Sequence, residues 1–195
     1  MKVLVVSEGK HEQAGALENL LRRLGGAGAE LVFDRVSRND IHTFHGRGSG
    51  YYKRAVRWLL EAEERGYEAM VLLIDEDGDR ERRRQIGDAQ GCSLSRLARA
   101  MGVAIRSFDA WMLAHEQALT DVLGRRIDRQ PEPETIRDPK RLCADLLAGS
   151  PNRMAQSEMY ARVADRVDIA VLSSRCQMGF GPFSRYVRQV FEQEA

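Results

Sequence analysis

Carboxylates gather at two places in the sequence, and each place directly follows an apolar segment. The candidates are Glu8 after residues 2–7, and Asp75, Asp77 and Asp79 after residues 69–74. Carboxylates that crowd together repel one another, so they are costly to keep ionised without a cation. Hard oxygen ligands with few histidines indicate Mg²⁺ or Mn²⁺ rather than Zn²⁺. Such an ion can polarise a phosphoryl oxygen and lower the pKa of a bound water.

The acidic loop at residues 75–79 also has a plainer interpretation. Loops of this kind are often solvated turns or helix caps. An EF-hand fits poorly, because Gly78 stands at the fourth position of the loop and not at the sixth. On an extended backbone, Asp75, Asp77 and Asp79 would share one side. Gly78 would allow the chain to turn tightly there.

Basic residues near these carboxylates are candidates for phosphate contacts. They are Lys10, Arg47, Arg80 and Arg82. Lys10 is close in sequence to Glu8, and Arg47 stands between two glycines whose backbone N–H groups could approach a phosphate. The arginines after the acidic loop could bind a phosphodiester backbone. They could equally neutralise neighbouring acids on a solvated face, and residues 46–50 could be an ordinary surface loop.

The elements that must position these residues alternate between strands and helices. We expect strands at 2–7, 30–36, 69–74 and 103–106, and helices at 11–24, 51–65, 92–101, 107–118, 139–148, 152–166 and 182–193. The nearly continuous apolar runs are typical of strands buried on both faces. This order predicts a doubly wound α/β fold with a mostly parallel central sheet. If strands 2–7 and 69–74 are neighbours, Glu8 and Asp75 face one crevice at their carboxyl ends.

Composition limits the classes of function. The chain has 195 residues, with 30 Lys+Arg against 29 Asp+Glu and a net charge of +1. This balance argues against broad electrostatic wrapping of nucleic acid, but it permits a local, metal-mediated contact. The cysteines, Cys92, Cys143 and Cys176, form no CxxC pair, which favours reduced thiols. The apolar run Val3–Val6 is too short for a signal or a membrane span, so we expect a soluble, cytoplasmic protein.

Two of these motifs together resemble the Toprim domain of topoisomerases, primases, recombination proteins and overcoming-lysogenisation-defect nucleases. Residues 5–10 are similar to its Glu-Gly-Lys motif and residues 72–79 to its Asp-x-Asp-x-Asp motif. Residues 104–114 look like a helix of small stand-alone Toprim-like bacterial proteins of unknown function, which often lie in defence-type gene neighbourhoods. That pattern usually carries Glu where this chain has Asp109, and Asp where it has His115. Residues 138–140 and 176–183 also resemble this family.

The resemblance implies a Toprim-like α/β domain at 1–124 and a helical C-terminal extension at 125–195 on the same core. It implies a Mg²⁺- or Mn²⁺-dependent nuclease, with Glu8, Asp75, Asp77 and Asp79 as metal-site residues. The catalytic candidates are Glu8, Lys10 and Asp109. The alternative interpretation of Asp109 is that it is only an acidic residue at a helix N-terminus, where the helix dipole favours a negative charge.

Two alternatives to a nuclease stay open from the sequence. One is a non-catalytic Toprim-like module that works with a partner protein such as an ATPase. The other is a phosphoacceptor receiver domain, which leaves the C-terminal helices and the segment around Asp109 unexplained. We expect a nucleic-acid partner and no membrane, and a homodimer also stays open.

Overall fold

The centre of the molecule is a four-stranded parallel sheet with the order β2-β1-β3-β4. The computed structural model describes residues 1–9, 12–37, 46, 48 and 50–192. The strands are β1 (Lys2–Ser7), β2 (Glu30–Arg35), β3 (Ala69–Asp75) and β4 (Ala98–Ala104). The predicted α/β class is therefore confirmed, and all strand pairs of the described chain are parallel.

Helices alternate with these strands and continue after the last one. They are α1 (Leu17–Arg23), α2 (Gly50–Glu64), α3 (Glu81–Gln90), α4 (Phe108–Met112), α5 (Glu116–Leu123), α6 (Pro139–Ala148), α7 (Gln156–Arg166), α8 (Ile169–Arg175) and α9 (Phe180–Glu192). A short π-helical segment lies at Glu12–Ala16, and short 3-10 helices lie at Gly26–Gly28 and Pro133–Thr135. No helix of the described part of the chain is long and apolar enough to cross a membrane.

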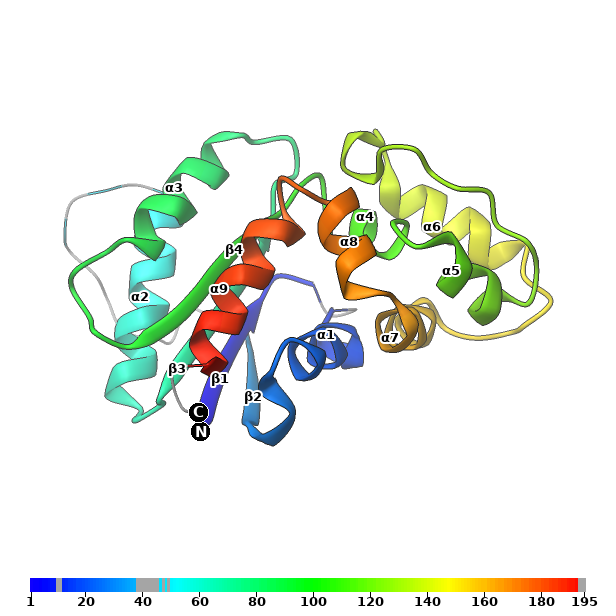
Figure 1. Cartoon of the computed structure of the whole chain (residues 1–195). Coiled ribbons are helices and arrows are strands. Elements are labelled where there is room, and N and C mark those ends of the chain that lie inside the picture. Colours follow the sequence, from blue (N-terminus) through cyan, green and yellow to red (C-terminus); the bar gives the residue numbers. More distant parts are fainter. Residues whose placement is uncertain (10–11, 38–45, 47, 49, 193–195) are drawn as a thin grey trace.

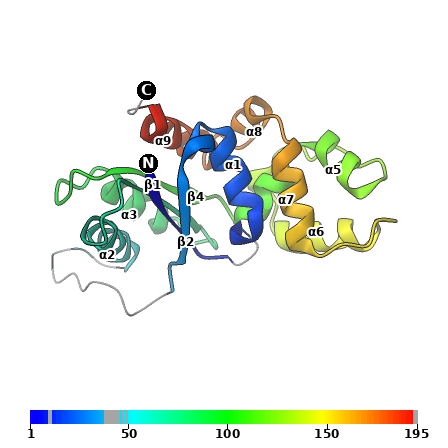
Figure 2. The ribbon, with the colours of Figure 1, turned by 90° about the horizontal axis from the view of Figure 1, so that it is seen from below.

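Both faces of the sheet are covered by helices, as the apolar runs of β1 and β3 require. Successive side chains alternate between the faces, so Val5 and Leu73 join one apolar cluster while Val6 and Leu72 join the other. Figures 1 and 2 show α2 and α3 on one side of the sheet and α1 and α9 on the other. This doubly wound arrangement leaves the carboxyl ends of the strands open at one edge.

The C-terminal helical region continues the cluster that lies on the α1 and α9 side. Trp111 of α4 is fully buried, with ring centroids 5.1 Å from Phe180 and 5.6 Å from Phe183 of α9. The last helix returns to the sheet and packs on β4, where a Cβ on Gly102 would lie 2.5 Å from the Phe183 ring. The division at residue 124 stays a prediction, since the apolar cluster is continuous across it.

The prediction for residues 92–106 is wrong. The structure has no helix over 92–101; instead β4 begins at Ala98, five residues before the predicted strand. The helix lies earlier, in the arginine-rich α3. Alanine, arginine and methionine favour helices intrinsically. Here pairing with β3 overrides that preference, and Arg99 is held by hydrogen bonds to carbonyl groups of Cys92 and Gln90.

The predicted helix 107–118 is split into α4 and α5 because His115 has an extended backbone. Its Nδ1 accepts a hydrogen bond from the Ala118 N–H at 3.1 Å and so caps α5. The short helix α8 was not predicted. Its N-terminus is capped by Asp168, which accepts from the N–H groups of Ala170 and Val171.

Candidate functional site

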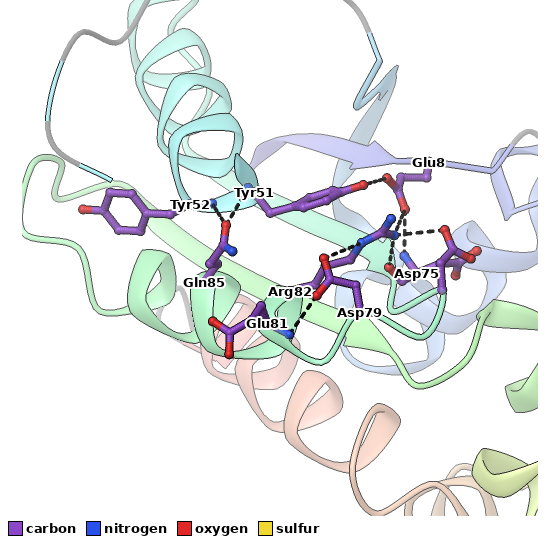
Figure 3. A network of polar contacts seen from close by, with 9 residues as sticks. Glu8, Tyr51, Tyr52, Asp75, Asp79, Glu81, Arg82 and Gln85 are labelled. Carbon is purple, nitrogen blue, oxygen red and sulfur yellow. Dashed lines mark hydrogen bonds and ion pairs between the residues drawn. The ribbon is translucent and has the colours of Figure 1, made fainter. Parts of the chain in front are cut away.

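Glu8 and Asp75 meet where the neighbouring strands β1 and β3 end. Glu8 Oε2 accepts the backbone N–H of Asp75 at 2.9 Å, and Oε1 accepts the hydroxyl of Tyr51 at 3.0 Å. These contacts connect the loop after β1 to the last residue of β3 and to α2 (Figure 3). The two residues therefore meet at the ends of adjacent strands, as expected from the strand order, but only Asp75 lines the pocket at this edge. Their roles in metal binding or catalysis stay predictions.

The acidic loop after β3 turns instead of running extended, so the expected one-sided alternation is wrong. Asp77 has φ +49° and Gly78 has φ +78°, and the Asp79 N–H donates to the Glu76 carbonyl at 2.9 Å. Asp79 accepts the backbone N–H of Glu81 at 3.1 Å, at the start of α3. This is the helix-cap arrangement that the plainer interpretation allows, although Gly78 makes the tight turn that was predicted for it.

A guanidinium stands among these carboxylates. Arg82 Nη1 donates to the Asp75 carbonyl at 2.6 Å and to Asp77 Oδ2 at 2.9 Å. It also lies 3.6 Å from Glu8 Oε2, while Nε lies 3.9 Å from Asp79 Oδ2. Arg82 reaches this position across the face of the Tyr51 ring, at 4.4 Å from its centroid (Figure 3). Of the two interpretations of Arg82, the structure displays neutralisation of acids; phosphate binding stays a prediction.

Glu12 is a further carboxylate of this site that the sequence analysis missed. It is buried, and its Oε2 has no hydrogen-bond partner. Burial, together with the charges of Asp75 and Glu8, raises the pKa of Glu12 well above its usual value. Glu12 comes four residues after Glu8, at the start of the predicted helix 11–24. Glu8 is not part of that helix, so no helical spacing connects the two carboxylates, and the sequence gives no local signal for Glu12.

The pKa of the Asp75 carboxyl group is also strongly raised. Burial raises its pKa from 3.8 to about 7, helped by the charges of Asp77, Glu8 and Asp109. A hydrogen bond from the Phe108 N–H to Oδ1, at 2.8 Å, partly opposes this shift. Near pH 7 the carboxyl group of Asp75 is therefore only partly ionised, chiefly because it is buried.

Asp109 lies in the first turn of α4 and is held by a buried network. Its Oδ2 accepts the Ser107 hydroxyl at 2.8 Å, and its Oδ1 accepts the Tyr160 hydroxyl. The backbone carbonyl of Asp109 accepts the Cys143 thiol at 3.6 Å. Burial raises the pKa of Tyr160, so the hydroxyl keeps its proton and stays a donor. The shorter side chain of Asp109 is thus fixed from α7 rather than free to reach outward.

A pocket of about 360 Å³ joins the end of β3 to the loops before α4 and α6. Its lining residues are Asp75, Asp77, Gly78, Arg106, Ser107, Asp109, Arg137, Asp138, Pro139 and Lys140. Arg106 and Arg137 were not predicted as site residues, although Arg106 lies within the motif at residues 104–114 and Arg137 directly precedes the segment 138–140. Glu8, Asp79 and Arg82 lie beside this pocket and not in its lining.

The remaining predicted site residues are Lys10, Arg47 and Arg80. Lys10 and Arg47 lie outside the residues that the structure describes. Arg80 is exposed between the acidic loop and α3, and it does not line the pocket. Trp58 and Trp111 are both fully buried, so they belong to the core and not to the site.

The donor set fits a divalent cation in its chemistry. The carboxylates supply only hard oxygen ligands. One of them, Glu12, has a buried oxygen without a hydrogen-bond partner. The negative charges around Asp75 contribute to its raised pKa. Within the described ranges, however, no three carboxylate, histidine or cysteine side chains converge as a ready metal site. Arg82 supplies the positive charge among these carboxylates instead.

Comparison with protein-family models, with curated proteins and with solved structures finds no match to this chain. The resemblance to Toprim proteins therefore stays a prediction from the sequence motifs.

Proposed function

We propose that this chain is a Toprim-type phosphoryl-transfer enzyme, a nuclease that hydrolyses phosphodiester bonds of nucleic acid with Mg²⁺ or Mn²⁺. The observation that carries this proposal is the meeting of Glu8 with Asp75 at the ends of adjacent parallel strands. Beside them lies a pocket lined by Asp75, Asp77 and Asp109. Ligands of open α/β sheets bind at this edge. We further propose that the protein acts in the cytoplasm, in defence against phage or mobile elements.

Asp75 and Asp77 would hold the metal, with Glu8 and Glu12 beside them and Asp79 as a secondary ligand. When bound, the ion would neutralise charge on a phosphoryl oxygen and lower the pKa of a water. Glu8 would act as general base or acid, since its carboxylate oxygens are positioned by the Asp75 N–H and by Tyr51. Asp109 is anchored by Tyr160 and Ser107, so it would contribute charge at the wall of the pocket.

The test is metal-dependent cleavage of supercoiled DNA, single-stranded DNA and RNA. We expect Glu8→Gln to reduce the rate by about a hundredfold or more, the range for a general acid–base group. We expect Asp75→Asn to reduce the rate through the loss of a metal ligand. Asp128→Asn is the matched control, because that side chain is 91% exposed and does not line the pocket. Absence of cleavage by a folded wild-type protein with Mn²⁺ would refute the proposed activity.

One observation favours a second candidate, the non-catalytic module that works with a partner such as an ATPase. Arg82 already neutralises the carboxylates of Glu8 and Asp77, so the fold does not require a metal there. This candidate predicts no cleavage with any substrate, and copurification of the chain with an ATPase. Loss of that complex in a variant with an intact fold would locate the surface that binds the partner.

A further inference from the structure

Three cations line the pocket without a role in the fold. Arg106, Arg137 and Lys140 are exposed, and their side chains make no hydrogen bond or ion pair with any residue that the structure describes. Most other arginines near the site are engaged; Arg82, for example, lies among carboxylates. Unpaired cations that converge on one pocket are arranged for an anion that comes from outside.

The backbone of Arg106 supports this interpretation. Arg106 has φ +65° and Asp77 has φ +49°, and they are the only non-glycine residues of the described chain with a positive φ. They are also bonded to each other, since the Asp77 N–H donates to the Arg106 carbonyl at 3.0 Å. Left-handed backbone is unfavourable for a residue with a Cβ and would suit glycine. Strain of this kind persists where the side chain is used, and both side chains line the same pocket.

Lys140 lies at the end of its helix where a positive charge is unfavourable. It lies in the first turn of α6, which begins at Pro139, where the helix dipole disfavours a cation. The nearby carboxylate of Asp138 is occupied, because it accepts the Arg141 N–H at 3.0 Å and caps the helix. An anion that binds in the pocket would gain from the side chain of Lys140. The backbone N–H groups of Arg141 and Leu142 already donate to Asp138, and Pro139 has no N–H.

We propose that Arg106, Arg137 and Lys140 bind a phosphate group of one nucleotide unit, next to the carboxylates of Asp75 and Asp77. This rests on the proposed nuclease function and adds the contact that positions the substrate. The pocket of about 360 Å³ is at the small end of ligand sites, so it suits a single nucleotide rather than a duplex. The phosphate belongs either to a strand or to a free nucleotide.

The test measures binding without metal, so that it does not depend on cleavage. Fluorescence anisotropy in EDTA follows a labelled single-stranded oligonucleotide, with a nucleoside monophosphate and inorganic phosphate as competitors. We expect Arg106→Gly, Arg137→Ala and Lys140→Ala each to weaken binding about tenfold or more. Each variant should also reduce the dependence of log K on log salt by about one unit. Arg126→Ala is the control, because that side chain is 92% exposed and does not line the pocket.

Arg106→Gly provides a readout that a structural role would not give. Glycine adopts this backbone freely, so the melting temperature should stay equal to that of the wild type or rise while binding falls. Competition by the nucleoside monophosphate would identify a free nucleotide as the source of the phosphate, whereas competition only by oligonucleotides would identify a strand.

Unchanged binding in the three variants, or no binding by the wild type, would overturn the proposal. Binding that depends on these cations in a protein without cleavage would support the phosphate site and refute the nuclease. Cleavage by the wild type, together with unchanged binding in the three variants, would support the nuclease and refute the phosphate site.

Discussion

Replacement of Arg82 by glutamine tests whether the guanidinium and a divalent ion compete for the same carboxylates. Arg82 Nη1 lies 2.9 Å from Asp77 Oδ2. An ion bound to that oxygen with a bond of about 2.1 Å could not lie more than about 5 Å from Nη1 if Arg82 keeps its place. If Arg82 instead moves away, its contacts with Asp77 and Glu8 must break first. Both cases weaken metal binding in the wild type.

The magnitude follows from Coulomb's law. A double and a single positive charge about 5 Å apart repel by about 1.7 kcal/mol even at the dielectric constant of water. This energy corresponds to a change of about 15- to 20-fold in a dissociation constant. Arg82 is largely buried, with 15% of its side chain exposed, so screening is weaker than in bulk water. We therefore expect Arg82→Gln to bind Mn²⁺ at least about tenfold more tightly than the wild type.

The assay is titration of Mn²⁺, followed by calorimetry or by the paramagnetic resonance of the free ion. A pH of 8 is suitable, because the raised pKa of Asp75, about 7, leaves that carboxylate mostly ionised. Arg84→Gln is the matched control on the same helix, since Arg84 is 64% exposed and pairs with Glu81 and Asp88. An unchanged or weaker affinity in Arg82→Gln, or an equal gain in Arg84→Gln, would refute this reasoning.

Three further predictions concern stability in the absence of metal. Burial raises the pKa of Asp75 from 3.8 to about 7, so its stabilising contribution is present below about pH 4 and is lost as the pH rises through 7. Urea unfolding in EDTA should therefore find Asp75→Asn more stable than the wild type by roughly 2–4 kcal/mol at pH 8, with little difference at pH 4. Tyr160→Phe removes a hydrogen bond to buried Asp109 and should cost about 1–3 kcal/mol in the free energy of unfolding; a change near zero would contradict the network. Gly102→Ala would bring a Cβ to 2.5 Å from the ring of Phe183 and should cost about 1–3 kcal/mol, part of which Phe183→Leu should restore in the double variant.

The parts of the fold that sequence analysis predicted are those with a local signal. Residues 2–7 and 69–74 are continuous apolar runs, and the structure buries both in adjacent parallel strands. Their adjacency brings Glu8 to Asp75, which is the central contact of the site. The strand β4 was predicted mostly as a helix, because its alanines, arginine and methionine carry a helical preference that only pairing with β3 reverses.

The site was predictable where its residues follow buried strands and not where they come from loops. Tyr51 reaches Glu8 from α2, and no short motif connects these two residues. Arg106 and Arg137 belong to loops before α4 and α6, which only the folded chain brings to one pocket. The left-handed backbone of Asp77 was missed for another reason: its N–H donates to the carbonyl of Arg106, a residue far away in sequence.

The packing of α9 on β4 affects the order in which this protein matures on the ribosome. Gly102 leaves room for the ring of Phe183, which is made roughly 80 residues later in the chain. At a translation rate of about 5–20 residues per second, α9 is made about 4–16 s after β4, and until then this face of β4 is not covered by α9. During this interval an apolar surface is open to other nascent chains or to a chaperone. A fragment that ends at residue 124 would keep it open permanently.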